Sequence, residues 1–244
     1  MLFRCIQAEN KKLRRSAIWF ACFLLPIIPA VYGTFNYAQN TGVLTMGWYS
    51  LWTQFTLFYA LLFYAPLIAL YAAYLWRLEH LDHNWNVFMA APVPVHDLFF
   101  GKLVIILKVT LITQLWLYAL FVLCGKFLSL PGMPDAQILL WALRGTLAGI
   151  AIGSLQLLLS MQIRSFAAPV GIALLGSIVG FLAANGSRLG QYFPYALMIR
   201  GMNANAETDV LGHGLAAFLL VSLCYFILFS GLSIFLLKNR DVKA

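Results

Sequence analysis

The stretch of the chain richest in groups able to do chemistry is residues 79–102, EHLDHNWNVFMAAPVPVHDLFFGK. It holds three of the eight acidic residues and three of the four histidines of a chain that is 62% hydrophobic and only 10% charged. Carboxylates and imidazoles at helical spacing can bind a metal ion, and Glu79 and His80 stand four and three residues before His83. No further ligand follows at a recognisable spacing, so we expect no metal site here.

The same stretch has the pattern of a short amphipathic helix. An apolar stripe at positions i, i+4, i+7 and i+8 is formed by Leu81, Trp85, Phe88 and Met89. Asp82 and Asn86 lie off this stripe, and Pro92 and Pro94 end the helix because proline disfavours helical geometry in the residue before it. Such a helix either lies in the membrane interface or docks its stripe into a groove of a partner protein, and we favour docking.

Hydropathy sets the class of protein that must position this stretch. A mean hydropathy of +0.85 leaves too few polar side chains to cover a soluble globule. About 20 apolar residues are needed for a helix to cross a hydrocarbon core of ~30 Å. Six such stretches predict an all-α membrane protein with one transmembrane domain over residues 1–244. The predicted spans are 16–36, 51–76, 103–124, 138–161, 166–184 and 214–237.

The distribution of basic residues predicts the orientation of the spans. With the N-terminus inside the cell, eleven Lys and Arg residues fall in the inner segments and three in the outer segments. A positive-inside bias of this size places both termini in the cytoplasm. The net charge of +8 therefore indicates topology rather than binding to nucleic acid.

Segments outside the spans are also expected to have structure. Residues 1–15 mix apolar side chains with cations, as in an amphipathic helix on the inner leaflet; a disordered basic flank is the alternative. The outer segment 185–213 is rich in aromatic residues and methionine and is predicted to be partly re-entrant, which requires burial of its irregular backbone. The short connection 162–165 predicts that the fourth and fifth spans are antiparallel neighbours.

The predicted spans lack the groups that an intramembrane enzyme or an ion-coupled carrier needs. They contain no Asp, Glu or His, and their charged residues, Lys108 and Arg144, are close enough to helix ends to act as anchors. A phosphate-binding loop requires G-x-x-x-x-G-K followed by Ser or Thr, whereas Leu and Phe follow the two Gly-Lys pairs here. If the protein moves a solute uphill, a separate cytoplasmic subunit must supply the energy.

Uncharged polar residues and glycines form the remaining patterns within the spans. Thr110, Thr113 and Gln114 share a face of the third span, and Gln156 and Ser160 share a face of the fourth. These side chains would line a conduit or, as we favour, form hydrogen bonds between helices. Glycines four residues apart let helix backbones approach closely, either between subunits or, as we favour, within the chain. They are Gly145, Gly149 and Gly153 in the fourth span and Gly176 and Gly180 in the fifth.

The stretch 79–102 resembles the cytoplasmic loop of type-2 ABC-transporter permeases. That loop has a Glu at the end of the second span, then a coupling helix, a Pro-Val pair and a Gly-Lys pair that opens the third span. The matching residues here are Glu79, Pro92, Val93, Gly101 and Lys102. The basic N-terminus, six spans and partly re-entrant element before the last span extend the resemblance over the whole chain. It implies ATPase coupling through Glu79, Asp82, Asn84, Trp85, Phe88 and Met89.

Within that superfamily the chain is similar to the lantibiotic-protection permeases. These tend to carry an Asn-Trp pair in the coupling helix, as at 84–85, and an aromatic-proline cluster such as YFPY at 192–195. The resemblance implies an exporter of a membrane-inserted antimicrobial peptide, built with two ATP-binding cassette ATPase subunits and a second permease, the same or homologous. ATP and Mg would bind the ATPase, so this chain would hold no cofactor. The candidate substrate-facing residues are Thr110, Thr113, Gln114, Tyr192, Phe193 and Tyr195.

Two other functions share these features. A non-transporting membrane scaffold or sensor subunit would have the same spans and the same loop. A type-2 permease for another amphiphilic substrate would differ from a lantibiotic permease only in the residues that contact the substrate, and the sequence does not show which residues those are. A membrane enzyme is disfavoured, because the predicted spans hold so few titratable groups.

Overall fold

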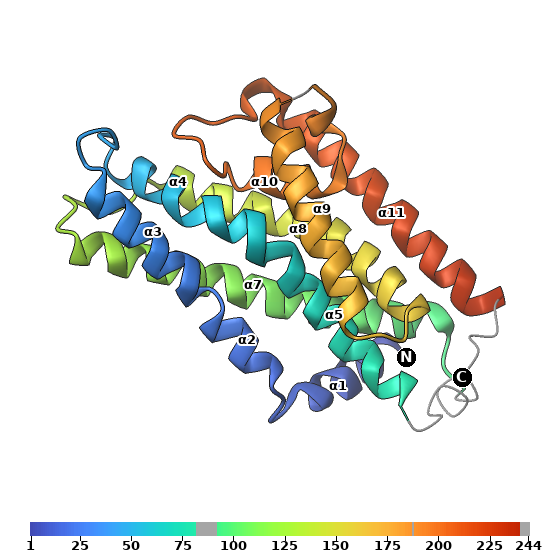
Figure 1. The fold of residues 1–244 in the computed structure, drawn as a ribbon. Coiled ribbons are helices and arrows are strands. Elements are labelled where there is room, and N and C mark those ends of the chain that lie inside the picture. The colour runs from blue at the N-terminus through green and yellow to red at the C-terminus, as the bar shows by residue number, and fades with distance from the viewer. Residues whose placement is uncertain (82–91, 187, 240–244) are drawn as a thin grey trace.

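The computed structural model describes residues 1–81, 92–186 and 188–239. Throughout this part of the chain the regular secondary structure is helical, and the long helices form one elongated bundle (Figure 1). The elements are α1 (Leu2–Leu13), α2 (Ile18–Leu24), α3 (Ile27–Gln39), α4 (Trp48–Phe58), the π-helix η1 (Tyr59–Phe63), α5 (Tyr64–His80), α7 (Val95–Phe127), α8 (Ala136–Gln162), α9 (Ala167–Gly186), the 3₁₀ turn η2 (Arg188–Gln191), α10 (Pro194–Gly201), the 3₁₀ turn η3 (Gly212–Gly214) and α11 (Leu215–Asn239).

Six segments among the described residues are long and apolar enough to cross a membrane, which confirms the predicted all-α fold with six candidate spans. They are Ile18–Gln39, Trp48–Arg77, Val95–Phe127, Ala136–Gln162, Ala167–Gly186 and Gly212–Asn239. The third begins eight residues before its predicted start, because α7 continues as one helix from Val95 through Asp97 and Lys102. With 33 residues it is about 50 Å long and extends beyond a ~30 Å hydrocarbon core.

Two of the spans are interrupted. The first divides into α2 and α3 at Pro26, since proline has no backbone N–H to continue the helical hydrogen bonds. In the second span the π-helical turn η1 separates α4 from α5. A π turn inserts an extra residue, so α4 and α5 present differently rotated faces to their neighbours.

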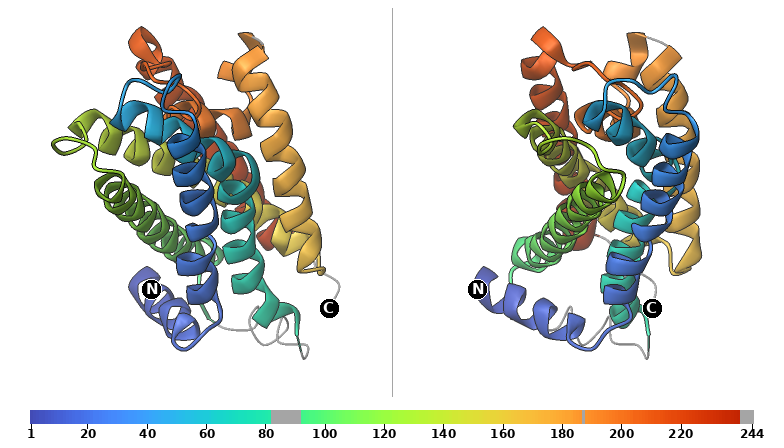
Figure 2. Two further views of the ribbon diagram at one scale, coloured as in Figure 1. Left: turned by 60° about the vertical axis from the view of Figure 1, so that its left-hand side comes forward. Right: turned by 90° about the vertical axis from the view of Figure 1, so that its left-hand side faces the viewer.

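The core of the bundle lies around α4, α5 and α8, where the largest side chains are fully buried. They include Trp52, Trp76, Trp141, Tyr64 and Tyr71. In contrast, α9 and α11 lie at the outside of the bundle (Figure 2) and bury few of their residues. Apolar side chains in such numbers on the outer surface suit a protein surrounded by lipid rather than water.

The short helix α10 packs between α8 and α9. Its buried residues run from Tyr195 to Ile199 and include Gly201. Because α10 contacts both long helices, α8 and α9 make little contact with each other. The two helices, predicted from the short connection to be antiparallel neighbours, thus contact each other at few residues, with α10 packed between them. The burial of α10 is what a re-entrant element requires, and its depth in the membrane stays a prediction.

The N-terminus forms the predicted amphipathic helix, α1, and the alternative of a disordered flank is wrong. This helix packs against α7 rather than standing apart from the bundle. Its buried residues are Glu9 and Leu13, whereas the side chain of Phe3 is 70% exposed. A buried carboxylate on this helix requires a cationic partner inside the protein.

Candidate functional site

Four charged side chains meet beneath α1 in a compact cluster, which we call the charge cluster: Glu9, Lys12, Glu79 and Lys102. The Nζ atom of Lys102 lies 2.7 Å from Oε1 of Glu79 and 3.1 Å from Oε1 of Glu9. The Nζ atom of Lys12 lies 2.6 Å and 2.7 Å from the same two oxygens. Two lysines therefore share two carboxylates, and the formal charges cancel.

Lys102 is the centre of the charge cluster. Its side chain is fully buried, and its ammonium also donates to the backbone carbonyl of Leu75 at 2.9 Å. The two carboxylates and this carbonyl match the three N–H donors of an ammonium group. The ammonium lies 4.7 Å from the centre of the Trp76 ring, close enough for a cation–π interaction. A buried charge is stable only when it is paired in this way.

The electrostatics favour the charged forms of Glu79 and Lys12. Burial of the Glu79 carboxyl opposes its charge, but Lys102 and Lys12 outweigh burial and hold the pKa of Glu79 below its ordinary value. Burial likewise opposes the charge of Lys12, yet Glu9 and Glu79 raise the pKa of its ammonium. Carboxylates and ammonium groups therefore stabilise one another.

Three elements bring these side chains together. Glu79 lies in the last turn of α5, Lys102 in the third turn of α7, and Glu9 and Lys12 one turn apart on α1. Gly101 permits the contact between α1 and α7, because a Cβ atom added there would lie 3.0 Å from Cβ of Cys5. Of the five residues that match the permease loop, Glu79, Gly101 and Lys102 thus lie at one place.

The other two matching residues, Pro92 and Val93, line a neighbouring pocket of about 430 Å³ under α1. Glu9 and Lys12 line the same pocket. The predicted coupling residues between these flanks lie outside the described residues: Asp82, Asn84, Trp85, Phe88 and Met89. The coupling helix itself stays a prediction. The segment before it contains Glu79 of the charge cluster, and the segment after it begins beside the cluster at Pro92 and Val93.

Sequence reasoning missed Glu9 and Lys12. Their spacing of three residues is compatible with one helix face, and Glu9 is the sole acidic residue before Glu79. The signal that could have identified Glu9 is its position as an isolated carboxylate in a strongly basic segment, where an ion pair is expected. The pairing with Lys102, 93 residues away, depends on how α1 docks.

The polar residues of α7 that were candidates for a conduit are buried and serve mainly to connect helices. The hydroxyl of Thr113 lies 2.8 Å from that of Tyr71 on α5 and 3.2 Å from Sγ of Cys22 on α2. The amide of Gln114 donates to Sδ of Met202 at 3.5 Å. Thr110 lines a small pocket between α7 and α8. These contacts support hydrogen bonding between helices, the interpretation favoured from the sequence.

The aromatic cluster at 192–195 divides in two. Tyr192 is 53% exposed, whereas Tyr195 is buried and its hydroxyl accepts a hydrogen bond of 2.8 Å from Gln156 on α8. Phe193 lies between these extremes and packs against Tyr195, with ring centres 6.0 Å apart. The six candidate substrate-facing residues thus do not share one surface, and contact with a substrate remains a proposal for each.

The glycines of α8 and α9 pack within the chain. A Cβ atom at Gly149 would lie 2.6 Å from the Tyr64 hydroxyl, and one at Gly153 would lie 3.1 Å from Ile106. Gly145 faces Met202, whose side chain would overlap an added Cβ atom. Gly176 and Gly180 both face Tyr195 of α10, at 2.6 Å and 2.8 Å from an added Cβ. The favoured interpretation, packing within one chain, therefore applies to all five.

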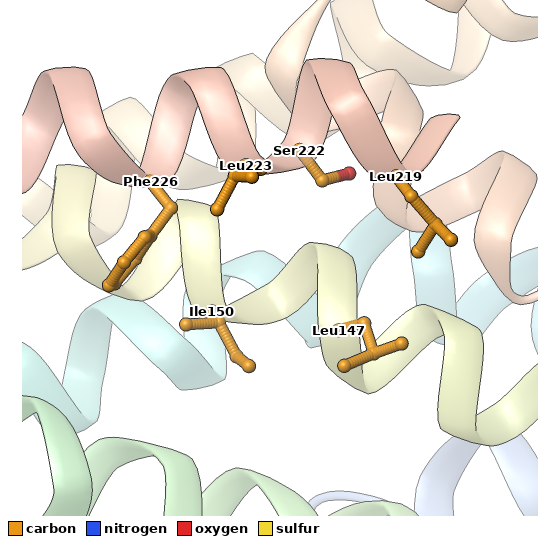
Figure 3. A pocket seen from close by; sticks show the side chains of 6 residues that line it. All are labelled: Leu147, Ile150, Leu219, Ser222, Leu223 and Phe226. Carbon is orange, nitrogen blue, oxygen red and sulfur yellow. The ribbon is translucent and has the colours of Figure 1, made fainter. Parts of the chain in front are cut away.

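An apolar groove of about 300 Å³ lies between α8 and α11 (Figure 3). Its lining residues are Leu147, Ile150, Leu219, Ser222, Leu223 and Phe226. None of the candidate substrate-facing residues lines it. A groove of this composition on the outside of a membrane protein is compatible with lipid chains.

The fold and the site define a class of protein: a polytopic helical membrane protein with a charge cluster at the flanks of one loop. The family model of ABC-2 family transporter proteins matches residues 5–180, and the chain belongs to this family. No curated protein matches the chain. The protein is therefore the membrane subunit of an ABC transporter and associates with an ABC ATPase subunit. The matched residues include the whole charge cluster.

Proposed function

We propose that the protein is the permease of an ATP-driven exporter that expels a membrane-inserted antimicrobial peptide, a lantibiotic, across the bacterial plasma membrane. It would work with two copies of the ATPase and a second permease subunit, the same or homologous. The permease role follows from the family, and the peptide substrate is supported by the Asn-Trp pair at 84–85 and the aromatic-proline cluster at 192–195.

The proposed orientation places both termini in the cytoplasm. In Figure 2, α1 and the final turn of α11 lie at the same end of the bundle as the end of α5. Most of the basic residues belong to this end, including those of α1 and Lys238 in the last turn of α11. The charge bias thus supports a cytoplasmic location for the charge cluster.

The observation that carries the proposed coupling mechanism is the ion pair between Glu79 and Lys102. These residues lie on either side of the segment 82–91, and their side chains are joined at 2.7 Å. A force applied to that segment would act on α5 and α7 together, because their cytoplasmic ends are tied to each other. Through Glu9 and Lys12 the same force would reach α1.

ATP hydrolysis is assigned to the partner subunit. The sequence has no phosphate-binding loop, so binding of ATP and Mg by the ATPase would supply the free energy. Closure of the ATPase pair would push on the segment 82–91, and the spans would then rearrange to release the peptide outward.

The experiment that tests this function measures resistance. A lantibiotic-sensitive strain would express the chain with its cognate ATPase, and the minimal inhibitory concentrations of a panel of lantibiotics would be determined. We expect resistance only when both subunits are present and the ATPase is active. Equal resistance with an ATPase that binds but does not hydrolyse ATP would favour a scaffold or sensor. Resistance confined to other amphiphilic compounds would overturn the peptide substrate while keeping the exporter.

A further inference from the structure

A second pocket, of about 420 Å³, lies between α1, α2 and α7 and is distinct from the charge cluster. We call it the basic pocket. Its lining residues are Asn10, Lys11, Leu13, Arg14, Arg15, Trp19 and Lys108. Four of the seven are cations, and no carboxylate lines the pocket.

The cations of the basic pocket differ from those of the charge cluster in having no counterion within the described part of the chain. Lys12 and Lys102 form ion pairs with Glu9 and Glu79, whereas Lys11, Arg14 and Arg15 form none there. Lys108 donates to the neutral side chain of Asn10 at 2.6 Å, which positions its charge without compensating it. Four like charges gathered at one pocket repel one another, so a bound anion would stabilise the arrangement.

The geometry of the pocket also indicates what kind of anion would fit. Trp19 forms one wall and is fixed by a hydrogen bond of 3.0 Å from its indole N–H to the carbonyl of Leu13. Its ring stacks on Phe23 at 6.1 Å, and Phe23 in turn meets Trp116 of α7 edge-on at 5.8 Å. These three rings form an aromatic stripe that leads from the basic pocket along the apolar spans.

The residues next to this stripe in the sequence include exposed apolar side chains. Phe20 is 70% exposed and Leu24 is 56% exposed, both on α2, and Leu115 on α7 is 47% exposed. A cationic pocket continued by an apolar surface matches a molecule with an anionic head and long hydrocarbon chains. Water-soluble phosphates would use the pocket but leave the stripe uncovered.

We propose that the basic pocket binds the phosphate-containing headgroup of an anionic phospholipid, with an acyl chain lying along the stripe of Trp19, Phe23 and Trp116. Basic pockets between helices at the cytoplasmic side of a membrane are suited to such headgroups. The basic pocket shares no residue with the charge cluster, so variants of one leave the side chains of the other unchanged.

Lipid binding to the purified full-length chain tests the proposal. The chain would be delipidated in a neutral detergent and titrated with phosphatidylglycerol or phosphatidylcholine, with binding followed by native mass spectrometry. We expect phosphatidylglycerol to bind more tightly, and the double variant Arg14→Gln with Lys108→Gln to weaken its binding roughly 30-fold. Inorganic phosphate and glycerol 3-phosphate should compete poorly, because they do not cover the aromatic stripe.

The matched control removes two cations elsewhere on the same side of the molecule, with Arg4→Gln and Lys238→Gln, both of which are exposed. This variant should bind phosphatidylglycerol like the unmodified chain. The charge-conserving variant Arg14→Lys with Lys108→Arg should also retain binding, which separates loss of charge from loss of folding. Equal weakening in the control variant, equal binding of both lipids, or full competition by inorganic phosphate would each overturn the proposal.

Discussion

Glu79 in the last turn of α5 and Lys102 near the start of α7 form a buried ion pair of 2.7 Å, on either side of the segment 82–91. Both residues also match the permease loop pattern, so the sequence motif has a physical meaning in the fold. It fixes the ends of two spans at the place where the segment connects them.

Removing one partner of the pair should destabilise the protein more than removing both. Lys102→Met leaves Glu9 and Glu79 to share Lys12, and such uncompensated buried charge typically costs about 3–5 kcal/mol. Glu79→Gln with Lys102→Met retains the balanced pair of Glu9 and Lys12 and should cost less. Thermal unfolding in detergent measures the difference, with Lys238→Gln as the exposed control. A double variant less stable than Lys102→Met would contradict this account.

Stability should be highest at intermediate pH. The lowered pKa of Glu79 gives stability that is present above the unfolded value of about 4.3 and is lost as pH falls through the folded pKa. The raised pKa of Lys12 gives stability that is present below about 10.4 and is lost as pH rises through the folded pKa. In melting curves across pH, Glu79→Gln should reduce the loss of stability at acid pH. Lys12→Met should reduce the loss of stability at alkaline pH. If both variants lose stability at acid and alkaline pH as the unmodified chain does, groups other than Glu79 and Lys12 cause the pH dependence.

Two glycines on one helix should respond in opposite ways to alanine. At Gly180 the added Cβ would lie 2.9 Å from the backbone of Tyr195, which cannot move without displacing α10, so Gly180→Ala should cost about 1–3 kcal/mol. Gly171 has open space and lies on the same helix. Gly171→Ala should be neutral or stabilising by up to about 1 kcal/mol, because alanine favours the helix. Similar melting temperatures for the two variants would be inconsistent with packing of α10 on α9.

The predicted coupling helix should hold the ATPase through its apolar stripe. Truncation of a buried aromatic anchor typically costs about 2 kcal/mol, or roughly 30-fold in affinity. We therefore expect Trp85→Ala, and more severely Trp85→Ala with Met89→Ala, to release the ATPase in a pull-down at matched membrane levels. Membrane insertion should be retained, because neither residue lies in a span.

The histidine control separates docking from metal binding at the same segment. His80 contacts the carbonyl of Ser160 at 3.0 Å, so His80→Ala with His83→Ala removes a minor contact between α5 and α8 and should keep the ATPase bound. Loss of the ATPase in this variant would favour a metal site. Undiminished pull-down of the ATPase by the double variant Trp85→Ala with Met89→Ala would instead mean that the segment does not dock through its apolar stripe.

Cysteine labelling tests the orientation of the chain. Single cysteines introduced at Thr41, Asp135 and Asn205 should react with an impermeant reagent from outside the cell. Those at Asp82 and Lys243 should react only after the membrane is opened. The positive-inside distribution motivates this expectation. External labelling at Asp82 would remove the basis for contact between the segment 82–91 and a cytoplasmic ATPase.

The class of protein and the importance of one loop could be predicted from the order of the residues alone. The number of spans depends on the length of apolar stretches, and the loop pattern depends on residue order. Both are local properties that need no knowledge of packing. For the same reason Glu79, Gly101 and Lys102 could be selected together, since a motif keeps its order along the chain.

Contacts between side chains far apart in the chain could not be predicted in this way, because they depend on how the helices pack. Glu9 reaches Lys102 across 93 positions because α1 turns back onto α7, and no periodicity in the N-terminal segment encodes that docking. Likewise, Gly176 and Gly180 face Tyr195 because α10 lies between α8 and α9, whereas the short connection predicted only that those helices are neighbours. Such contacts arise from the way helix surfaces fit together in space, which depends on all the neighbouring side chains at once.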